Sequence, residues 1–194
     1  MLKQTGPRSK PPNRKPPPDT QHPTPDLMPY TLDQLNAMAE AEFVAAIGPA
    51  FEDTPAIAAQ VWPQRPFASR ADLHQKMVAV VQTLTDDEKL ALINAHPDLG
   101  ARVAMAEASV AEQSKAGLNQ LSAEEYDRFQ QLNQQYKATF GFPFILAVAG
   151  HTKTSILENF AQRLHNSPAV EMATALGEIE KIARLRLEAW IPNA

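Results

Sequence analysis

His96 is the residue with the clearest capacity for proton transfer. Histidine is the one side chain whose unperturbed pKa lies near neutral pH. His96 precedes Pro97, which disfavours the helical conformation at His96 and is itself favoured at the first position of a helix. This pattern predicts an imidazole just outside a helix N-terminus, where free N–H groups attract an anion. We expect a general acid or base at this junction; a histidine that only caps a helix fits the same pattern.

A second polar group follows in the chain, at Ser109, Glu112 and Gln113. If this stretch is helical, the three side chains lie on one face, at spacings of three and four residues. A carboxylate beside an imidazole commonly sets a proton-transfer group near neutral pH. The alternative is a solvated polar stripe. A Ser-His-acid hydrolase is disfavoured, because no serine lies in a strand–turn–helix signature.

The third feature is an apolar stretch at residues 139–146, which contains three phenylalanines. Gly141 lets the backbone bend or approach a ligand closely, and Pro143 lacks an N–H group. The aromatic side chains could line a pocket or pack two helices together. Further along, Arg163 could bind a substrate carboxylate through two parallel hydrogen bonds, or form a surface ion pair.

The elements that must position these residues are predicted to be helices. Five stretches have apolar residues at spacings of three and four, and most follow a Ser or Thr that can cap a helix N-terminus. No stretch alternates long enough to predict a sheet. The expected helices follow Thr31, Ser69, Thr85 and Ser122, with a last one over residues 170–187; stops are expected at Gly48 and at 166–168, and a structured loop at 62–67. We therefore predict an all-α fold of about seven to nine helices.

Composition divides the 194 residues into an arm and one domain. Nine of the 17 prolines lie in residues 1–30, and residues 1–26 carry almost no large apolar side chains. Such a segment cannot bury enough surface to offset the entropy of ordering it. We expect residues 1–26 to be a disordered, Pro-rich basic arm, and residues 27–194 to form a single compact helical domain.

Charge and residue content exclude several classes of protein. Without cysteine the chain can form no disulfide, thiolate metal site or Cys nucleophile. Residues 1–25 hold five basic and one acidic residue, so the rest carries a formal charge of −8 within a total of −4. An acidic body argues against nucleic-acid binding. No apolar run is long enough for a membrane span, and no secretory signal is recognisable, so a cytoplasmic location is expected.

Five motifs together resemble one family. They occur in its order and spacing: Trp-Pro-Gln-Arg-Pro-Phe at 62–67, Ala-His-Pro-Asp-Leu-Gly at 95–100, Ser-Val-Ala-Glu-Gln at 109–113, Phe-Gly-Phe-Pro-Phe at 140–144 and Arg-Leu-His-Asn at 163–166. The chain resembles the 2-oxo-4-hydroxy-4-carboxy-5-ureidoimidazoline (OHCU) decarboxylase family over roughly residues 30–190. Members form (S)-allantoin in the last step of urate degradation.

The resemblance implies an all-helical homodimer that uses neither a metal nor an organic cofactor. It makes His96 the principal catalytic acid or base, Glu112 its partner and Arg163 the group that orients the substrate anion. The substrate-binding residues that it implies are Pro97, Ser109, Gln113, Phe140, Gly141, Phe142, Phe144, Ile145 and Arg163. It also implies a functional link to hydroxyisourate hydrolase and urate oxidase, and no nucleic-acid or membrane partner.

Two other classes of function fit the chain less well. A helical scaffold for other purine-degrading enzymes would depend on the arm and tolerate changes at His96. A cofactor-free hydrolase of a cyclic amide or ureide would use His96 and Glu112 to activate water. Neither explains why all five motifs occur together.

Overall fold

The structure, a computed structural model, describes residues 29–100, 113–114, 118 and 121–192. In these residues it contains eight α-helices, two short 3-10 helices and no strand, which confirms the all-α prediction and the expected number of helices. The predicted arm at 1–26 lies outside the described residues. None of the described helices combines the length and the apolar character needed to cross a membrane.

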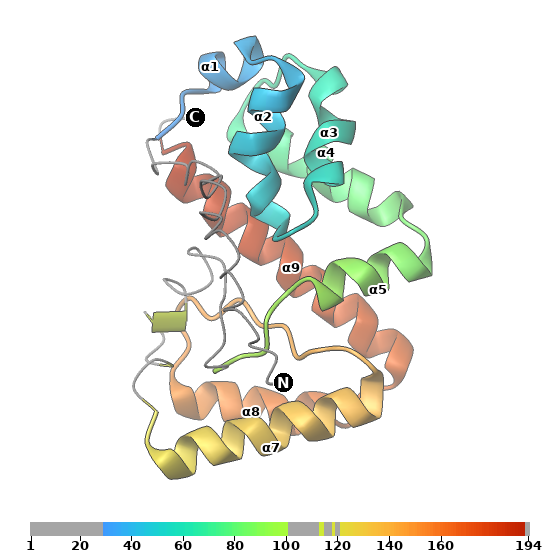
Figure 1. The fold of residues 1–194 in the computed structure, drawn as a ribbon, viewed down its shortest axis with the longest axis vertical. Helices are drawn as coiled ribbons and strands as arrows, with labels where there is room; N and C mark the ends of the chain where they lie inside the picture. Colours follow the sequence, from blue (N-terminus) through green and yellow to red (C-terminus); the bar gives the residue numbers. More distant parts are fainter. Residues whose placement is uncertain (1–28, 101–112, 115–117, 119–120, 193–194) are drawn as a thin grey trace, which may run out of the picture.

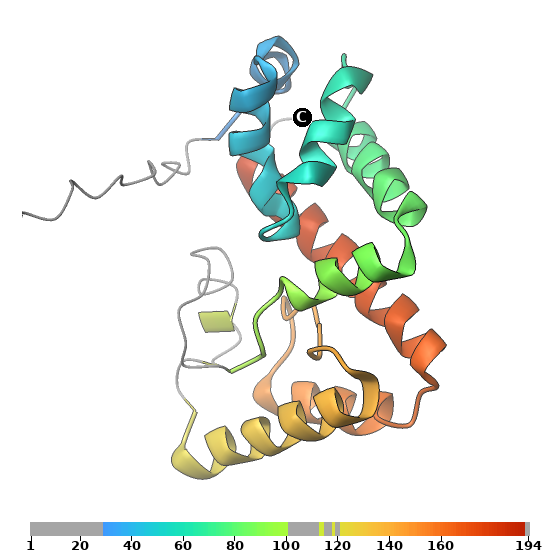
Figure 2. The same cartoon turned by 45° about the vertical axis from the view of Figure 1, so that its right-hand side comes forward.

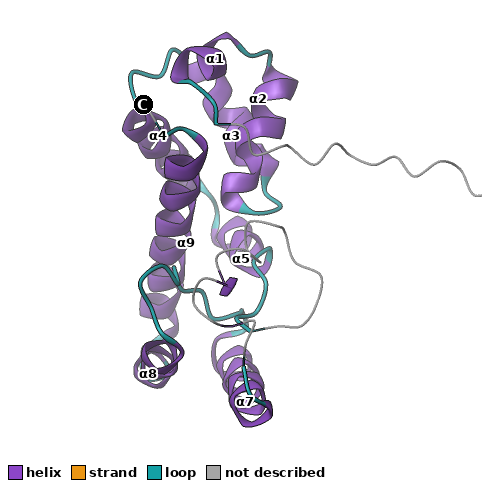
Figure 3. Ribbon diagram, turned by 90° about the vertical axis from the view of Figure 1, so that its left-hand side faces the viewer, coloured by secondary structure: helices purple, strands orange, loops and turns teal. Residues whose placement is uncertain are grey.

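One long helix connects the two ends of the molecule. The first end holds the helices before residue 84 and the other holds two later helices, while α9 extends from one to the other (Figure 1, Figure 2). Figure 3 shows the same arrangement from the side, with α5 at mid-height beside α9. The elements are α1 (Leu32–Ala37), α2 (Glu40–Ile47), η1 (Gly48–Phe51), α3 (Pro55–Val61), η2 (Trp62–Gln64), α4 (Arg70–Thr83), α5 (Asp86–Asn94), α7 (Ala123–Phe140), α8 (Lys153–Arg163) and α9 (Pro168–Trp190).

The helix starts agree with the local sequence signals. Thr85 and Ser122 each accept a hydrogen bond from the backbone N–H three residues later, and the glutamate at that position bonds back to the cap. Thr31 forms the same reciprocal pair with Gln34, and Ser69 caps α4. Because each cap satisfies N–H groups that the helix leaves unpaired, these starts are determined locally.

The predicted loop at 62–67 is an ordered connection that begins with η2. Arg65 lies over the Trp62 ring, 4.0 Å from its centroid, and donates hydrogen bonds to the carbonyls of Asn36 and Met38 at 3.0 and 2.8 Å. These contacts therefore hold the loop between α3 and α4 against the residues that join α1 to α2.

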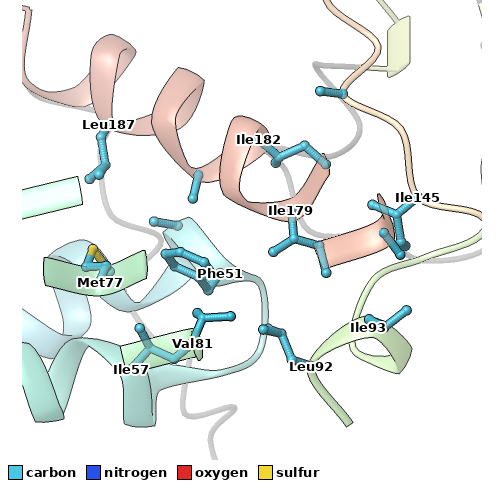
Figure 4. Packing of buried hydrophobic residues seen from close by; sticks show 14 of the residues in the cluster. Phe51, Ile57, Met77, Val81, Leu92, Ile93, Ile145, Ile179, Ile182 and Leu187 are labelled. Carbon is cyan, nitrogen blue, oxygen red and sulfur yellow. The ribbon is translucent and has the colours of Figure 1, made fainter. Parts of the chain in front are cut away.

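The core at the first end packs against α9. Phe51, Ile57 and Met77 are at most 1% exposed and face the apolar side of that helix (Figure 4). Ile179 and Leu187 of α9 are fully buried in the same cluster. Burying a side chain of this size contributes about 1.5–3 kcal/mol, so this interface fixes η1, α3 and α4 against α9.

The other end is built around aromatic rings. Tyr136 of α7 is fully buried, and its ring makes edge-on contacts with Phe142, Phe144 and Phe160. Phe144 stacks on Phe160 of α8, with ring centroids 3.7 Å apart. These contacts hold the segment after α7 between α7 and α8, and this segment forms one wall of the site.

Candidate active site

A small cavity lies where five separate parts of the chain meet. Its volume is about 30 Å³, enough for about two water molecules and well below the range for ligand pockets. The described residues that line it are Glu52, His96, Pro97, Leu99, Gln113, Phe144, Ile145, Leu146, Val148, Ile182 and Arg186. The cavity therefore combines an imidazole, a carboxylate, a guanidinium and an amide with apolar walls.

His96 lies two residues after the last residue of α5, and its side chain lines the cavity. Nδ1 is 2.9 Å from the carbonyl oxygen of Leu92. Because a carbonyl can only accept, Nδ1 carries the proton in this hydrogen bond. Nε2 is buried and has no hydrogen-bond partner, although the side chain lines the cavity. In the neutral ring Nε2 therefore holds a lone pair, which can accept a proton from a bound molecule.

The surroundings of His96 favour the neutral ring. Burial lowers the pKa of His96, and this effect outweighs the hydrogen bond to Leu92 and the negative charge of Glu52, which raise it. The positive charge of Arg186 lowers it further. His96 is thus prepared to act first as a base.

The connection after His96 is held by side chains that are distant in sequence. Asn133 of α7 donates a hydrogen bond to the Leu99 carbonyl at 2.9 Å, and Lys137 pairs with Asp98 at 2.8 Å. Gln113 accepts a hydrogen bond from the Gly100 N–H at 2.9 Å. These contacts fix the backbone that follows His96 and so help to position its imidazole.

The prediction that a helix begins at Pro97 is wrong. Residues 97–98 are irregular and residues 99–100 form a turn, with Gly100 at a φ of +70°. The Leu99 carbonyl in this turn accepts the hydrogen bond from Asn133. His96 therefore lies just after the C-terminal end of α5, and residues 97–100 do not form a helix N-terminus beside it.

Arg186 of α9, which sequence reasoning missed, is a cation that lines the cavity. Its guanidinium Nη2 lies 2.9 Å from Oε1 of Glu52, and Nη1 donates to the Pro49 carbonyl at 3.1 Å. The side chains of Arg186 and Glu52 are only 3% and 6% exposed. A signal was present: Arg186 follows Ile182 by four residues, on the buried stripe of a helix where an arginine needs a partner.

Arg163, expected to orient the substrate anion, does not line the cavity. Its Nε and Nη2 bind Oε1 of Glu171 at 2.8 and 2.5 Å, and its Nη1 donates to the Ile145 carbonyl at 2.6 Å. The guanidinium lies over the Phe144 ring, 4.4 Å from its centroid. Arg163 thus holds two residues that do line the cavity.

Glu171 is the centre of this buried network. It accepts hydrogen bonds from Tyr136, Asn166 and Arg163 and is fully buried. Burial and the hydrogen bond to Glu171 raise the pKa of Tyr136, so its hydroxyl stays protonated and can donate. Since every partner is matched, the network stabilises one arrangement of α7, α8, α9 and the wall segment.

Replacing Arg163 by lysine is expected to lower the free energy of unfolding by about 1–3 kcal/mol. Lysine keeps the positive charge but cannot bind Glu171, reach the Ile145 carbonyl and stack on Phe144 at once. Urea denaturation measures the change. Arg128→Lys, at an exposed position on α7, is the matched control. A loss no larger than in the control would show that the network contributes little.

The remaining expected binding residues fall into three groups. Pro97, Gln113, Phe144 and Ile145 line the cavity. Phe140, Gly141 and Phe142 do not: Gly141, at a φ of +81°, ends α7, while Phe140 and Phe142 pack on Tyr136. Ser109 and Glu112 lie outside the described residues, so their place at the cavity stays a prediction. No group of three or more His, Asp or Glu side chains that could hold a metal ion occurs in the part of the chain that the structure describes.

Comparison with known proteins finds one consistent family. The model of the OHCU decarboxylase family matches residues 36–188. The chain is 40% identical over 158 residues to the 2-oxo-4-hydroxy-4-carboxy-5-ureidoimidazoline decarboxylase of Halalkalicoccus jeotgali, which covers 81% of this chain and 90% of that protein.

Two further matches are to longer proteins. The chain is 43% identical over 157 residues to the uric acid degradation bifunctional protein of a Bacillus species, covering 81% of this chain and 31% of that protein. A crystal structure of (S)-allantoin synthase superposes with a TM-score of 0.69 at 30% identity, covering 84% of this chain and 54% of that one. The chain thus spans about a third of the first protein and about half of the second.

Proposed function

Because the chain belongs to the OHCU decarboxylase family, a family of carbon–carbon lyases, we propose that it converts OHCU to (S)-allantoin, the last step of urate degradation. The observation that carries this proposal is the unpartnered Nε2 of His96, which is buried in a cavity also lined by the guanidinium of Arg186. One group can move a proton and the other can bind a carboxylate, and this reaction requires both.

The chemistry needs no electron acceptor other than the substrate. When the bond to the carboxylate breaks, CO₂ leaves and its electron pair forms a C=C bond to the adjoining ring carbon. The π pair of the C=N bond moves to the ring nitrogen, which takes up a proton from solvent, giving an enol. The enol hydroxyl then gives up its proton, and the ring carbon that bears the ureido group gains one. The protein has to orient the carboxylate, accept the hydroxyl proton and deliver a proton to one face of that carbon.

His96 is the group that we assign to the proton transfers. Neutral Nε2 accepts the hydroxyl proton, and the resulting imidazolium can return a proton to the ring carbon from the same side of the cavity. Protonation from a fixed direction accounts for a single enantiomer. Glu112, taken from the family resemblance, is proposed as its partner.

Arg186 is the group that we assign to the substrate carboxylate, in place of Arg163. Arg186 lines the cavity beside Glu52 and His96, whereas Arg163 does not line it. A planar guanidinium can bind a carboxylate through two hydrogen bonds and so fix its orientation. Pro97, Gln113, Phe144 and Ile145, together with Ser109, are proposed to contact the ring and ureido groups.

The chirality of the product tests the proposed reaction. OHCU also decays spontaneously, so rate alone is a weak criterion. Urate is incubated with urate oxidase and hydroxyisourate hydrolase, with or without this protein, and circular dichroism follows the allantoin formed. We expect faster formation of one enantiomer and release of CO₂. Racemic allantoin at the uncatalysed rate would contradict the proposal, and a ring-opened acid without CO₂ release would identify a hydrolase.

On the acid side of the pH profile, the fall in kcat/KM is expected to occur at a low pH. Only neutral His96 can accept a proton, so kcat/KM rises with pH through the pKa of His96 and is constant above it. Because burial lowers that pKa, the midpoint of the fall in kcat/KM should lie below the ordinary value of 6.5. Kinetics on freshly generated OHCU measure the profile. A midpoint above pH 6.5 would mean that a neighbouring carboxylate outweighs burial.

The assembly and cellular setting form the last part of the proposal. We expect a cytoplasmic homodimer that works beside urate oxidase and hydroxyisourate hydrolase. The bifunctional relative, whose name places it in uric acid degradation, supports the link to that pathway. Size-exclusion chromatography with light scattering tests the dimer.

A further inference from the structure

Glu52 has an unusual backbone conformation at the wall of the cavity. It directly follows η1 and has φ 51° and ψ −139°. It is the one non-glycine residue with a positive φ in the residues that the structure describes. This region of conformational space is almost restricted to glycine, so a glutamate there is strained and must be held by its surroundings. Strain of this kind concentrates at functional sites.

The side chain of Glu52 is held by Arg186. The two groups are 2.9 Å apart, nearly buried, and belong to separate elements, the end of η1 and the C-terminal part of α9. Both line the cavity together with His96. The five N–H groups of a guanidinium lie in one plane, so a bond on one side sets the direction of the others. Glu52 and the Pro49 carbonyl therefore help to set the direction of the Arg186 N–H groups.

The charge of Glu52 matters as much as its hydrogen bond. A substrate carboxylate and Glu52 are two anions that bind the same cation, Arg186. Each anion therefore weakens the attraction between Arg186 and the other anion. In a decarboxylation the substrate carboxylate loses its charge as it becomes CO₂. A cation that binds the carboxylate very tightly would stabilise the substrate more than the transition state and slow the reaction.

On the basis of the function proposed above, we propose that Glu52 is a positioning residue of the decarboxylation, which orients the Arg186 guanidinium and moderates its attraction for the substrate carboxylate. The proposal predicts opposite effects on binding and turnover when the charge is removed. A residue that only stabilises the fold would change neither the KM nor the kcat of the folded protein.

The test is Glu52→Gln, which keeps the shape and one acceptor but removes the charge. We expect KM to fall and kcat to fall, each by about 3- to 30-fold, as typical for a coupling between contacting charged groups. Asp53→Asn is the matched control, because Asp53 is the next residue in the chain, is exposed and does not line the cavity. An unchanged KM and kcat in Glu52→Gln, or a raised KM, overturns the proposal.

A second variant tests the proposal if Glu52→Gln does not fold, and a second measurement tests it if no turnover is observed. If Glu52→Gln does not fold, Glu52→Asp keeps the charge but shortens the side chain; a lowered kcat supports the proposal and wild-type constants overturn it. If the wild type gives no turnover, the decarboxylase assignment fails by itself. Calorimetry with allantoate, a ureido carboxylate, then tests Glu52 directly: tighter binding to Glu52→Gln than to wild type supports its role, and equal or weaker binding refutes it.

Discussion

Replacing His96 by asparagine is expected to lower kcat by roughly 10²–10⁴-fold, the usual contribution of a general acid or base. The asparagine amide can take the place of Nδ1 as donor to the Leu92 carbonyl, so the end of α5 keeps its hydrogen bond. What is lost is Nε2, the one ring atom that is buried in the cavity without a partner. The substitution therefore removes the proton acceptor and leaves its surroundings nearly unchanged.

The measurement is the rate of (S)-allantoin formation from freshly generated OHCU, followed by circular dichroism. His165→Asn is the control, because His165 is exposed and lies just after α8. The control should retain the wild-type rate, and both variants should have similar thermal midpoints. If His96→Asn keeps near-wild-type turnover and produces one enantiomer, another group transfers the proton and the assignment to His96 is wrong.

Replacing Arg186 by lysine is expected to reduce kcat/KM by about 10²-fold or more, mainly through a higher KM. Lysine carries the same charge, but at a single point and without the planar set of donors. It cannot bind Glu52, the Pro49 carbonyl and a substrate carboxylate with one geometry. A loss of this size after a charge-conserving change would show that direction, and not charge alone, is required.

Arg184→Lys is the matched control for this experiment. Arg184 lies two residues earlier on α9, and its side chain is 53% exposed and pairs with Glu188. Breaking a buried ion pair also destabilises a protein, by up to about 3–5 kcal/mol when one charge is left without its partner. Kinetics should therefore be measured well below the thermal midpoint of each variant. An Arg186→Lys variant with the wild-type KM would exclude a contact between this residue and the substrate.

The parts of the structure that depend on neighbours in sequence could be predicted. Thr85 and Ser122 begin helices because their hydroxyl groups bond to N–H groups three residues away. The turn after His96 could not be predicted in this way. The Leu99 carbonyl in this turn accepts a hydrogen bond from Asn133, which lies 34 residues further along the chain, whereas Pro97 by itself suggested the start of a helix.

In the site, the carboxylate partners of the two arginines could not be predicted from the sequence either. A single sequence shows that Arg163 and Arg186 are both near apolar residues, but not which carboxylate each one meets. Folding brings each arginine to its partner. Glu171 lies 8 residues from Arg163 in the chain, and Glu52 lies 134 residues from Arg186. Glu52 gave no local signal at all, because its strained backbone is imposed by contacts made elsewhere in the fold.

The long helix α9 also sets the spacing between Glu171 and Arg186. Glu171 in its first turn anchors the Arg163 network, and Arg186 reaches the cavity about 22 Å further along its axis, since each residue advances the helix by about 1.5 Å. Each residue also turns the helix by about 100°. Deleting or inserting one residue between these positions would rotate Arg186 away from Glu52 while Glu171 stayed in place. The interval between these two α9 residues is therefore constrained by rotation as well as by distance.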